Sequence, residues 1–377
     1  MESATIFRGL EGVSFSESSI CKVDGINGRL YYRGYSIEEL AGNSTFEEVC
    51  YLLLYGKLPK KAELAGFTKK LLAERELNDE TINLIKTMRK KAAPMDTLRT
   101  AVSMLPAYDR DAYGNSEESN MRKSISLISK IGSITAVIGN GSYIEPNPEL
   151  NHAANFLYML KGKAPSARDS RILDLMMLLH AEHSSNASTF SALVTGSTLA
   201  DIYAAITSAI ATLKGPLHGG ADEAALRMME KIGKPEKTED YINKALEGKE
   251  RIMGFGHRVY KAYDPRARII RKELERLQKS SNDKVRNLAG IAFHAERMMI
   301  ERLGKTKGIW PNVDFFSGPV YTSIGIPASI FTPLFAVSRI PGWCAHLLEY
   351  WKNNRLLRPL ETYVGKLDLK YVPIGKR

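Results

Sequence analysis

Three short segments carry the side chains best suited to acid–base chemistry, and each places one titratable group among glycines, prolines or aromatic residues. They are residues 215–220 around His218, residues 254–261 around His257, and residues 311–318 around Asp314. Glycine lets a backbone approach a ligand closely, and a polar group held in an apolar loop is a common way to build a catalytic site. Two histidines and one aspartate therefore predict proton transfer rather than binding alone.

The surroundings of each group suggest its role. Asp314 precedes two aromatic residues, which would exclude water and make its carboxylate a stronger base, suited to a weakly acidic C–H proton. His218, beside glycines at an expected helix start, would stay neutral and donate a hydrogen bond to an oxygen becoming enolate-like. His257 would polarise a second carbonyl. Loss of one such donor typically costs about 3–4 kcal/mol of transition-state stabilisation.

Arg266, Arg339 and Arg358 would bind an anionic substrate. An arginine fork binds carboxylates bidentately, and a buried arginine needs an anionic partner, so three of them imply a polycarboxylate. Two alternatives stay open. Arg339 would instead pair with a structural carboxylate, or the two histidines would make structural hydrogen bonds.

The other histidines do not favour a metal site. Those in helical surroundings are interpreted as structural, namely His152, His294 and His346. Four more would have to supply zinc ligands, but they show neither an HExxH pattern nor a carboxylate at ligand spacing; these are His180, His183, His218 and His257. We therefore expect no metal.

Length and composition indicate a globular protein of two domains. The chain has 377 residues, of which 44% are hydrophobic and 25% charged, as in soluble proteins. Its net charge of +11 is compatible with nucleic acid, an anionic membrane surface or a small anionic substrate. Three cysteines without a CxxC pair predict no disulfide framework and favour a reducing interior; they are Cys21, Cys50 and Cys344.

No segment predicts export or a membrane span. Residues 1–8 lack the basic and apolar blocks of a secretion signal. The most apolar stretch, residues 320–337, is interrupted by Pro327 and Pro333, so we expect buried core rather than a transmembrane helix. A cytoplasmic location is the expectation.

The elements that must position these groups are mostly helices. Residues 20–35 alternate around an Asn27-Gly28 turn and predict a small hairpin. Thr45 with Glu48 predicts a capping box, and Ser36 offers another cap. Helices are expected at residues 168–180, 198–213, 266–279, 288–303 and 320–353. The more polar residues 217–318 are expected to form a small domain, with residues 1–216 and 319–377 forming a large one.

Several of these motifs occur together and in order. They are residues 214–220 (KGPLHGG), 253–261 (MGFGHRVYK) with 264–267 (DPRA), 312–314 (NVD) and 335–339 (FAVSR). From residue 9 to residue 374 the chain resembles citrate synthases of the shorter archaeal and bacterial type. That family implies an all-α, two-domain fold with a small N-terminal β-hairpin, in which the small domain closes over substrate and the large one dimerises.

The resemblance also implies a reaction of the tricarboxylic acid cycle, catalysed by an acyltransferase that converts the acyl group into an alkyl group on transfer. Asp314 would take a methyl proton from acetyl-CoA while His218 stabilises the enol. His257 would protonate the oxaloacetate carbonyl as the enol attacks, and citryl-CoA would be hydrolysed to citrate and CoA. Acetyl-CoA is a substrate here, so no cofactor is expected.

Binding residues follow from the same resemblance. Oxaloacetate or citrate would be bound by His183, Arg266 and Arg339, with Arg358 contributed by the neighbouring subunit of a homodimer. CoA would contact the backbone of Gly254, Phe255 and Gly256, and its phosphates would contact Lys261 with Lys305 or Lys307. A solvated loop is the alternative for the last two lysines.

Four positions depart from the family pattern: Ser184, Leu360, Ala93 and Asp222, where relatives commonly carry glutamate, arginine, a His-Pro-Met histidine, and asparagine or alanine. Ser184 and Leu360 are expected near the carboxylate pocket, which leaves the substrate range open. An alternative activity is 2-methylcitrate synthase using propionyl-CoA, because one methylene changes pocket energetics by only about 1–3 kcal/mol. A nucleic-acid-binding protein is a remote alternative, because the basic residues are mixed with acidic ones rather than clustered in stripes.

Overall fold

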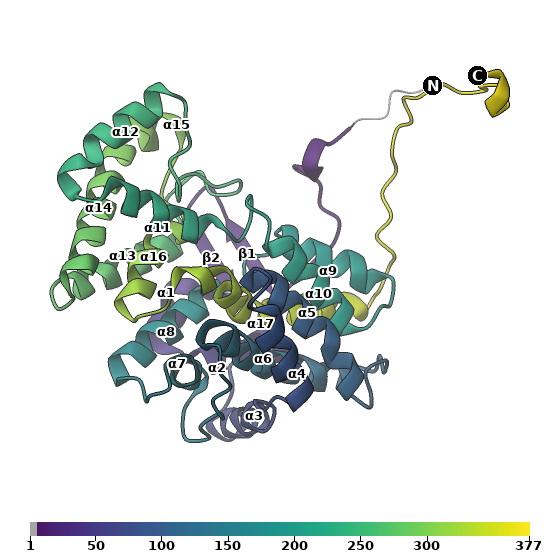
Figure 1. Ribbon diagram of the computed structural model, residues 1–377, viewed down its shortest axis with the longest axis horizontal. Coiled ribbons are helices and arrows are strands. Elements are labelled where there is room, and N and C mark those ends of the chain that lie inside the picture. Colours follow the sequence, from purple (N-terminus) through teal and green to yellow (C-terminus); the bar gives the residue numbers. More distant parts are fainter. Residues whose placement is uncertain (1–5) are drawn as a thin grey trace.

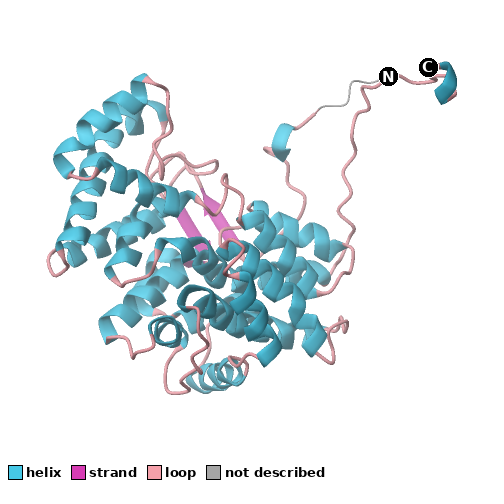
Figure 2. Cartoon of the chain, viewed as in Figure 1, coloured by secondary structure: helices cyan, strands magenta, loops and turns pink. Residues whose placement is uncertain are grey.

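The computed structural model describes residues 6–377 and is almost entirely helical (Figures 1 and 2). The expected all-α fold with a small N-terminal β element is confirmed. Strands β1 (Cys21–Asp24) and β2 (Arg29–Tyr32) form the expected antiparallel hairpin, in which Val23 pairs with Leu30. A short third strand, β3 (Tyr35–Ser36), was not expected and extends the hairpin to three strands. Residues 1–5, which belong to the segment examined for an export signal, lie outside the described residues.

The helices of the first half form the larger body. They are α1 (Ile37–Asn43), α2 (Phe46–Tyr55), α3 (Lys61–Ala73), α4 (Asp79–Met88), α5 (Pro94–Met104), α6 (Glu117–Asn140), α7 (His152–Lys161), α8 (Ala167–His180), α9 (Ala187–Ser197) and α10 (Ile202–Leu213). The second half contributes α11 (Ala221–Ile232), α12 (Thr238–Glu247), α13 (Pro265–Gln278), α14 (Asp283–Met299), α15 (Lys305–Lys307), α16 (Val313–Ser323) and α17 (Phe331–Trp351).

Local capping explains where several helices begin. The capping box of Thr45 and Glu48 opens α2 as predicted, and the Ser36 hydroxyl accepts from the backbone N–H of Glu39 at α1. Helix α10 begins later than expected, because Asp201 caps it through the backbone N–H of Ala204. These caps satisfy backbone donors that would otherwise lack a partner.

The apolar stretch predicted as one helix over residues 320–353 is two helices. Helix α16 ends at Ser323 and α17 begins at Phe331. Between them Gly325 has a φ of +68°, a conformation that glycine adopts without strain, and Pro327 follows. Helix α17 is buried along most of its length and packs against α6, α9 and α2, so the expectation of a core element is confirmed.

Helices α11 to α16 gather on one side of the molecule, away from α2 to α7 (Figure 1). Helix α16 is the centre of this group, since α11, α13 and α14 all pack on it. The predicted boundary between residues 318 and 319 lies inside α16, which runs continuously through Pro319. The division into residues 1–216 and 319–377 against 217–318 stays a prediction.

Two long segments leave the helical body. After α17 the chain runs outward as an extended tail, and the exposed residues 6–14 also lie outside the helical body (Figure 1). Across residues 6–377, no helix is both long and apolar enough to cross a membrane.

Candidate active site

Backbone hydrogen bonds bring the His257 segment alongside the Asp314 segment. The N–H of Gly256 donates to the carbonyl of Trp310 (2.9 Å), and the N–H of Asn312 donates to the carbonyl of Gly254 (2.9 Å). Gly254 has a φ of +79°, and a Cβ there would lie only 2.7 Å from the Cα of Phe315. Glycine is therefore required at residue 254 by both conformation and space.

Asp314 lies in the first turn of α16, where the side chain of Asn312 accepts from its backbone N–H (3.1 Å). Burial raises the pKa of the Asp314 carboxyl to about 6, against the lowering effect of Arg266; Asp264 adds to the rise. A carboxylate with this pKa is ionised at neutral pH and is a better proton acceptor than a surface aspartate.

His218 lies in the turn before α11 and contacts Ser188 at the start of α9. Its Nε2 accepts from the Ser188 N–H (3.3 Å) and lies 2.7 Å from the Ser188 hydroxyl. The Trp343 indole N–H in turn donates to that hydroxyl (3.2 Å). Burial, followed by Arg339, lowers the pKa of His218 to about 4. The ring is therefore neutral at pH 7, and with Nε2 as acceptor its proton lies on Nδ1.

His257 is fixed in the opposite tautomer. Its Nδ1 accepts from the backbone N–H groups of Val259 (3.0 Å) and Tyr260 (3.1 Å). Burial, followed by Arg266, lowers the pKa of His257 to about 4. The neutral ring therefore carries its proton on Nε2, which is free to donate to a bound oxygen.

His183 adjoins this group. Its ring centre is 5.1 Å from that of His257, and its Nε2 lies 3.3 Å from the Tyr260 hydroxyl. Burial, followed by Arg266, lowers the pKa of His183 well below its usual range. Three neutral imidazoles are thus placed near two arginine charges, which leaves the positive charge on the guanidinium groups.

Arg266 and Arg339 are both almost fully buried. Arg266 makes a bidentate ion pair with Asp264, through Nε (3.1 Å) and Nη2 (2.8 Å). Arg339 donates from Nε to the carbonyl of His180 (2.7 Å). Among residues 6–377 no carboxylate pairs with Arg339, and its two terminal nitrogens make no hydrogen bond, so the alternative of a structural carboxylate partner is wrong for this chain. These terminal nitrogens are available to an anion.

Some predicted site residues make no contact with the buried histidines and arginines described above. Arg358 is exposed on the C-terminal tail and makes no hydrogen bond or ion pair within residues 6–377. Leu360 is 85% exposed on the same tail, and its expected place near the carboxylate pocket stays a prediction. Ser184 does follow His183 directly, in a left-handed conformation with φ of +52°.

The lysines predicted to contact CoA phosphates are exposed. The Lys261 carbonyl accepts from the Trp310 indole N–H (3.1 Å), which ties the end of the His257 segment to the loop after α15. The two lysines of α15, Lys305 and Lys307, therefore belong to the same edge of the molecule. Both the CoA and the solvated-loop interpretations stay open for them.

The remaining histidines mostly have protein partners. His180 contacts the Met176 carbonyl (2.7 Å), His294 the Pro235 carbonyl (3.0 Å), and His346 the buried Glu182 (2.8 Å). Within residues 6–377 no group of three potential ligands has a geometry suited to a metal.

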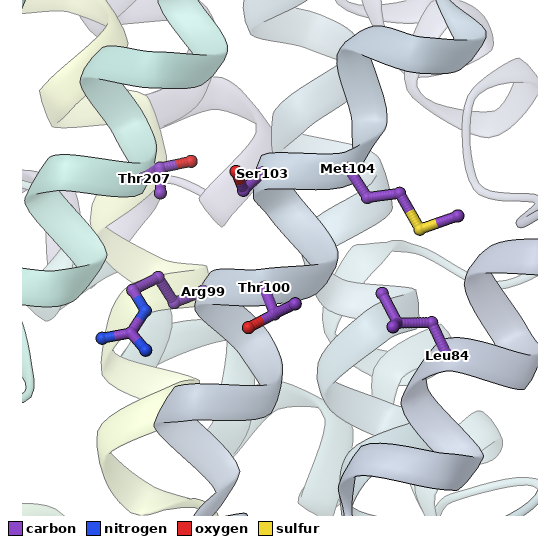
Figure 3. A pocket seen from close by; sticks show the side chains of 6 residues that line it. All are labelled: Leu84, Arg99, Thr100, Ser103, Met104 and Thr207. Atoms are coloured by element: carbon purple, nitrogen blue, oxygen red, sulfur yellow. The ribbon is translucent and has the colours of Figure 1, made fainter.

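Two surface hollows lie elsewhere. The first, about 420 Å³, is lined by residues of α4, α5 and α10 (Figure 3). The second, about 200 Å³, contains Arg122 and Lys130, which are already paired with Asp109 and Glu74. Neither hollow is lined by His218, His257 or Asp314, so we do not place the chemistry there.

Comparison with known proteins identifies the family. The family described as "Citrate synthase, C-terminal domain" matches residues 9–360. A citrate synthase of Deinococcus radiodurans is 44% identical over 99% of this chain and 100% of its own. The chain belongs to the citrate synthase family. These matches confirm the resemblance that the motifs indicated. The members of this family are transferase enzymes.

Two further relatives resemble this chain over its full length. A solved structure of Thermoplasma acidophilum citrate synthase, in a ternary complex with carboxymethyl coenzyme A and oxaloacetate, is 37% identical to this chain over 100% of both chains, with a TM-score of 0.94. A 2-methylcitrate synthase of Corynebacterium glutamicum is 40% identical over 100% of both chains.

The motifs did not point to Ser188, Trp343 and Tyr260. Ser188 and Trp343 lie far along the chain from His218, and their contacts arise only in the folded protein. Tyr260 was within a recognised motif, three residues after His257. Its place three residues after His257 was the available signal, and the structure buries its side chain, 2% exposed, beside His183.

Proposed function

We propose that this chain forms citrate from acetyl-CoA, oxaloacetate and water. The proposal depends on one observation, the protonation states of three side chains at neutral pH. Asp314 has a raised pKa and is ionised at neutral pH, while His218 and His257 are neutral with opposite nitrogens protonated. One base and two neutral donors are what enolisation and carbonyl addition require.

In the first step Asp314 removes a proton from the methyl group of acetyl-CoA. The C–H electron pair forms the enol double bond, and the thioester carbonyl oxygen gains the charge. The Nδ1–H of His218 donates to that oxygen. A neutral imidazole suits this role, because its pKa is closer to that of an enol than the pKa of an imidazolium is.

In the second step the enol carbon attacks the ketone carbon of oxaloacetate. The new C–C bond forms as the ketone C=O π bond breaks, and the Nε2–H of His257 protonates the resulting alkoxide. The imidazole then regains a proton from solvent, and Asp314 releases the methyl proton to solvent. Water then attacks the thioester of citryl-CoA, which releases CoA as a thiol and leaves citrate.

Arg266 and Arg339 support binding of the oxaloacetate carboxylates. Arg339 has free terminal nitrogens, and Arg266 uses only two of its nitrogens on Asp264. His183 lies beside both His257 and these charges, where it would donate to the same substrate. Burial strengthens each of these interactions relative to water.

A homodimer completes the site in this proposal. Arg358 lies on an extended tail that leaves its own helical body (Figure 1), and the tail carries apolar side chains such as Val364, 92% exposed. An arm of this kind is suited to packing on a second copy. Lys261 with Lys305 or Lys307 would contact the CoA phosphates, and the predicted cytoplasmic location stays a prediction.

Product identification tests the proposal. Purified protein is incubated with oxaloacetate and either acetyl-CoA or propionyl-CoA, and both thiol release and the organic acid are measured. We expect oxaloacetate-dependent thiol release with a higher kcat/KM for acetyl-CoA, and citrate as product. A strong preference for propionyl-CoA would instead establish the 2-methylcitrate activity that the Corynebacterium glutamicum relative is named for.

A further inference from the structure

A buried pair of side chains, His346 on α17 and Glu182 in the loop after α8, has no part in the mechanism above. Nε2 of His346 lies 2.8 Å from Oε1 of Glu182, and the two side chains are 6% and 0% exposed. A carboxylate only accepts hydrogen bonds, so His346 is the donor. Glu182 directly precedes His183. The pair therefore lies one residue along the chain from a proposed substrate-binding histidine.

Helix α17 contacts this loop at successive turns. Arg339 donates from Nε to the carbonyl of His180 (2.7 Å), the last residue of α8. One turn later, a Cβ at Gly342 would overlap the carbonyl oxygen of Ala181, so the helix and the loop touch there. His346 follows after another turn and contacts the next residue of the loop. Residues three, four and seven apart share a helix face, so one face of α17 holds three consecutive residues.

The backbone of Glu182 is also held by Tyr32 of strand β2. The buried Tyr32 hydroxyl donates to the Glu182 carbonyl (2.8 Å) and accepts from the Glu182 N–H (3.2 Å). After His183 the chain turns through Ser184, whose φ is +52°. Serine keeps such a conformation only where surrounding contacts impose it. The position of the His183 ring therefore depends on how residue 182 is held.

Stability alone does not account for Glu182. Its Oε2 has no hydrogen-bond partner within the described part of the chain, and a buried oxygen left unpaired costs free energy. The carboxylate acts instead on Arg339. Burial lowers the pKa of Arg339 below its usual value, and the charge of Glu182 opposes that effect. Glu182 therefore bears on both groups proposed to bind the substrate, the His183 ring through the backbone and the guanidinium through its charge.

We propose that His346 is a positioning residue for oxaloacetate: its hydrogen bond to Glu182 fixes the loop so that the His183 ring and the Arg339 guanidinium bind one dicarboxylate together. This inference rests on the proposed function, in which both groups bind that substrate. Recognition of an anion by several donors requires each of them to be held within about 0.5 Å of its place. Loss of the hydrogen bond therefore weakens oxaloacetate binding more than it slows the chemical steps.

The test compares two amides at residue 346. In His346→Gln the side-chain amide reaches about as far as Nε2 of histidine and still donates to Glu182, whereas in His346→Asn it stops short. We expect KM for oxaloacetate to rise about tenfold in His346→Asn, with a smaller change in kcat, and to stay within about twofold of wild type in His346→Gln. The rise in unfolding temperature that oxaloacetate causes measures binding without turnover. It should be smaller in His346→Asn and normal in His346→Gln.

A second variant covers the case in which His346→Asn does not fold. Glu182→Met removes the acceptor without leaving a buried charge unpaired, and KM for oxaloacetate should rise in it as well. The matched control is His294→Leu, which removes a histidine contact to the Pro235 carbonyl (3.0 Å) on helix α14. It should lower the unfolding temperature and leave KM for oxaloacetate unchanged.

The proposal would be overturned by a wild-type KM for oxaloacetate in His346→Asn, or in Glu182→Met where that variant replaces it. An equal rise in the two amide variants, or the same rise in the His294→Leu control, would also overturn it. Failure of the proposed function would look different, because wild type would then neither release thiol nor be stabilised by oxaloacetate.

Discussion

The Ser188 hydroxyl lies 2.7 Å from Nε2 of His218, and this contact, together with the Ser188 N–H, decides which nitrogen of the histidine carries its proton. The Nδ1–H is left as the donor to substrate. The Trp343 indole holds the serine from its other side. The proposed enol-stabilising group is thus oriented by residues from α9 and α17.

Ser188→Ala should lower kcat about tenfold, because one hydrogen bond that fixes the His218 ring is worth about 1–1.5 kcal/mol. The oxaloacetate dissociation constant should change little. Steady-state kinetics and calorimetric titration measure the two effects. Ser185→Ala is the matched control, since Ser185 is exposed in the same loop. Equal kcat values in the two variants would contradict the assigned role of Ser188.

Tyr260→Phe should weaken oxaloacetate binding about tenfold by removing the hydroxyl 3.3 Å from His183. The backbone N–H that holds His257 is retained, so kcat should fall less than KM for oxaloacetate rises. Tyr241→Phe on α12 controls for loss of a hydroxyl elsewhere. If KM for oxaloacetate stays at its wild-type value, Tyr260 does not position His183.

The raised pKa of Asp314 predicts the acid limb of activity. As pH falls through about 6, Asp314 gains a proton and ceases to be a base, so kcat/KM for acetyl-CoA should fall with a slope of one. His218 and His257 have pKa values near 4 and should not contribute above pH 5. A pH–rate profile that stays flat down to pH 4.5 or so, as for an ordinary aspartate, would count against Asp314 as base.

Arg358→Ala should be nearly inactive alone, yet mixing it with Asp314→Asn should restore activity. In a mixed dimer, the site with a normal Asp314 would receive the normal Arg358 from the other chain. Thiol release after joint refolding measures this, with each variant refolded alone as control. No recovery in demonstrably mixed dimers would show that Arg358 does not act across the interface.

The motifs made much of the site predictable. His257 and Asp314 lie in segments whose glycines are required by tight backbone contacts, and such requirements leave a mark in the sequence. Ser188 left none, because its contact with His218 spans 30 residues and a serine near a helix start is equally well explained as a cap. The role of Arg358 is untested for a different reason. The residue is expected to act in the neighbouring subunit, and a single chain does not show where it would lie there.

The secondary-structure prediction was wrong where two sequence signals competed. Residues 320–353 are predominantly apolar, which favoured one helix, but Gly325 and Pro327 break it. Hydrophobic periodicity reports burial, and both helices are buried, so the break had to be taken from the glycine and proline alone. The strand β3 is only two residues long, too short for alternation to be recognised.

The most direct test of the central claim compares Asp314→Asn with wild type. Exchange of the methyl protons of acetyl-CoA with solvent deuterium, measured with L-malate in place of oxaloacetate, reports the first step alone, because malate has no ketone for the enol to attack. Calorimetry confirms that oxaloacetate still binds. We predict that wild type catalyses the exchange and that Asp314→Asn loses it by at least about 10³-fold while binding oxaloacetate. Exchange by the variant at the wild-type rate would contradict the account.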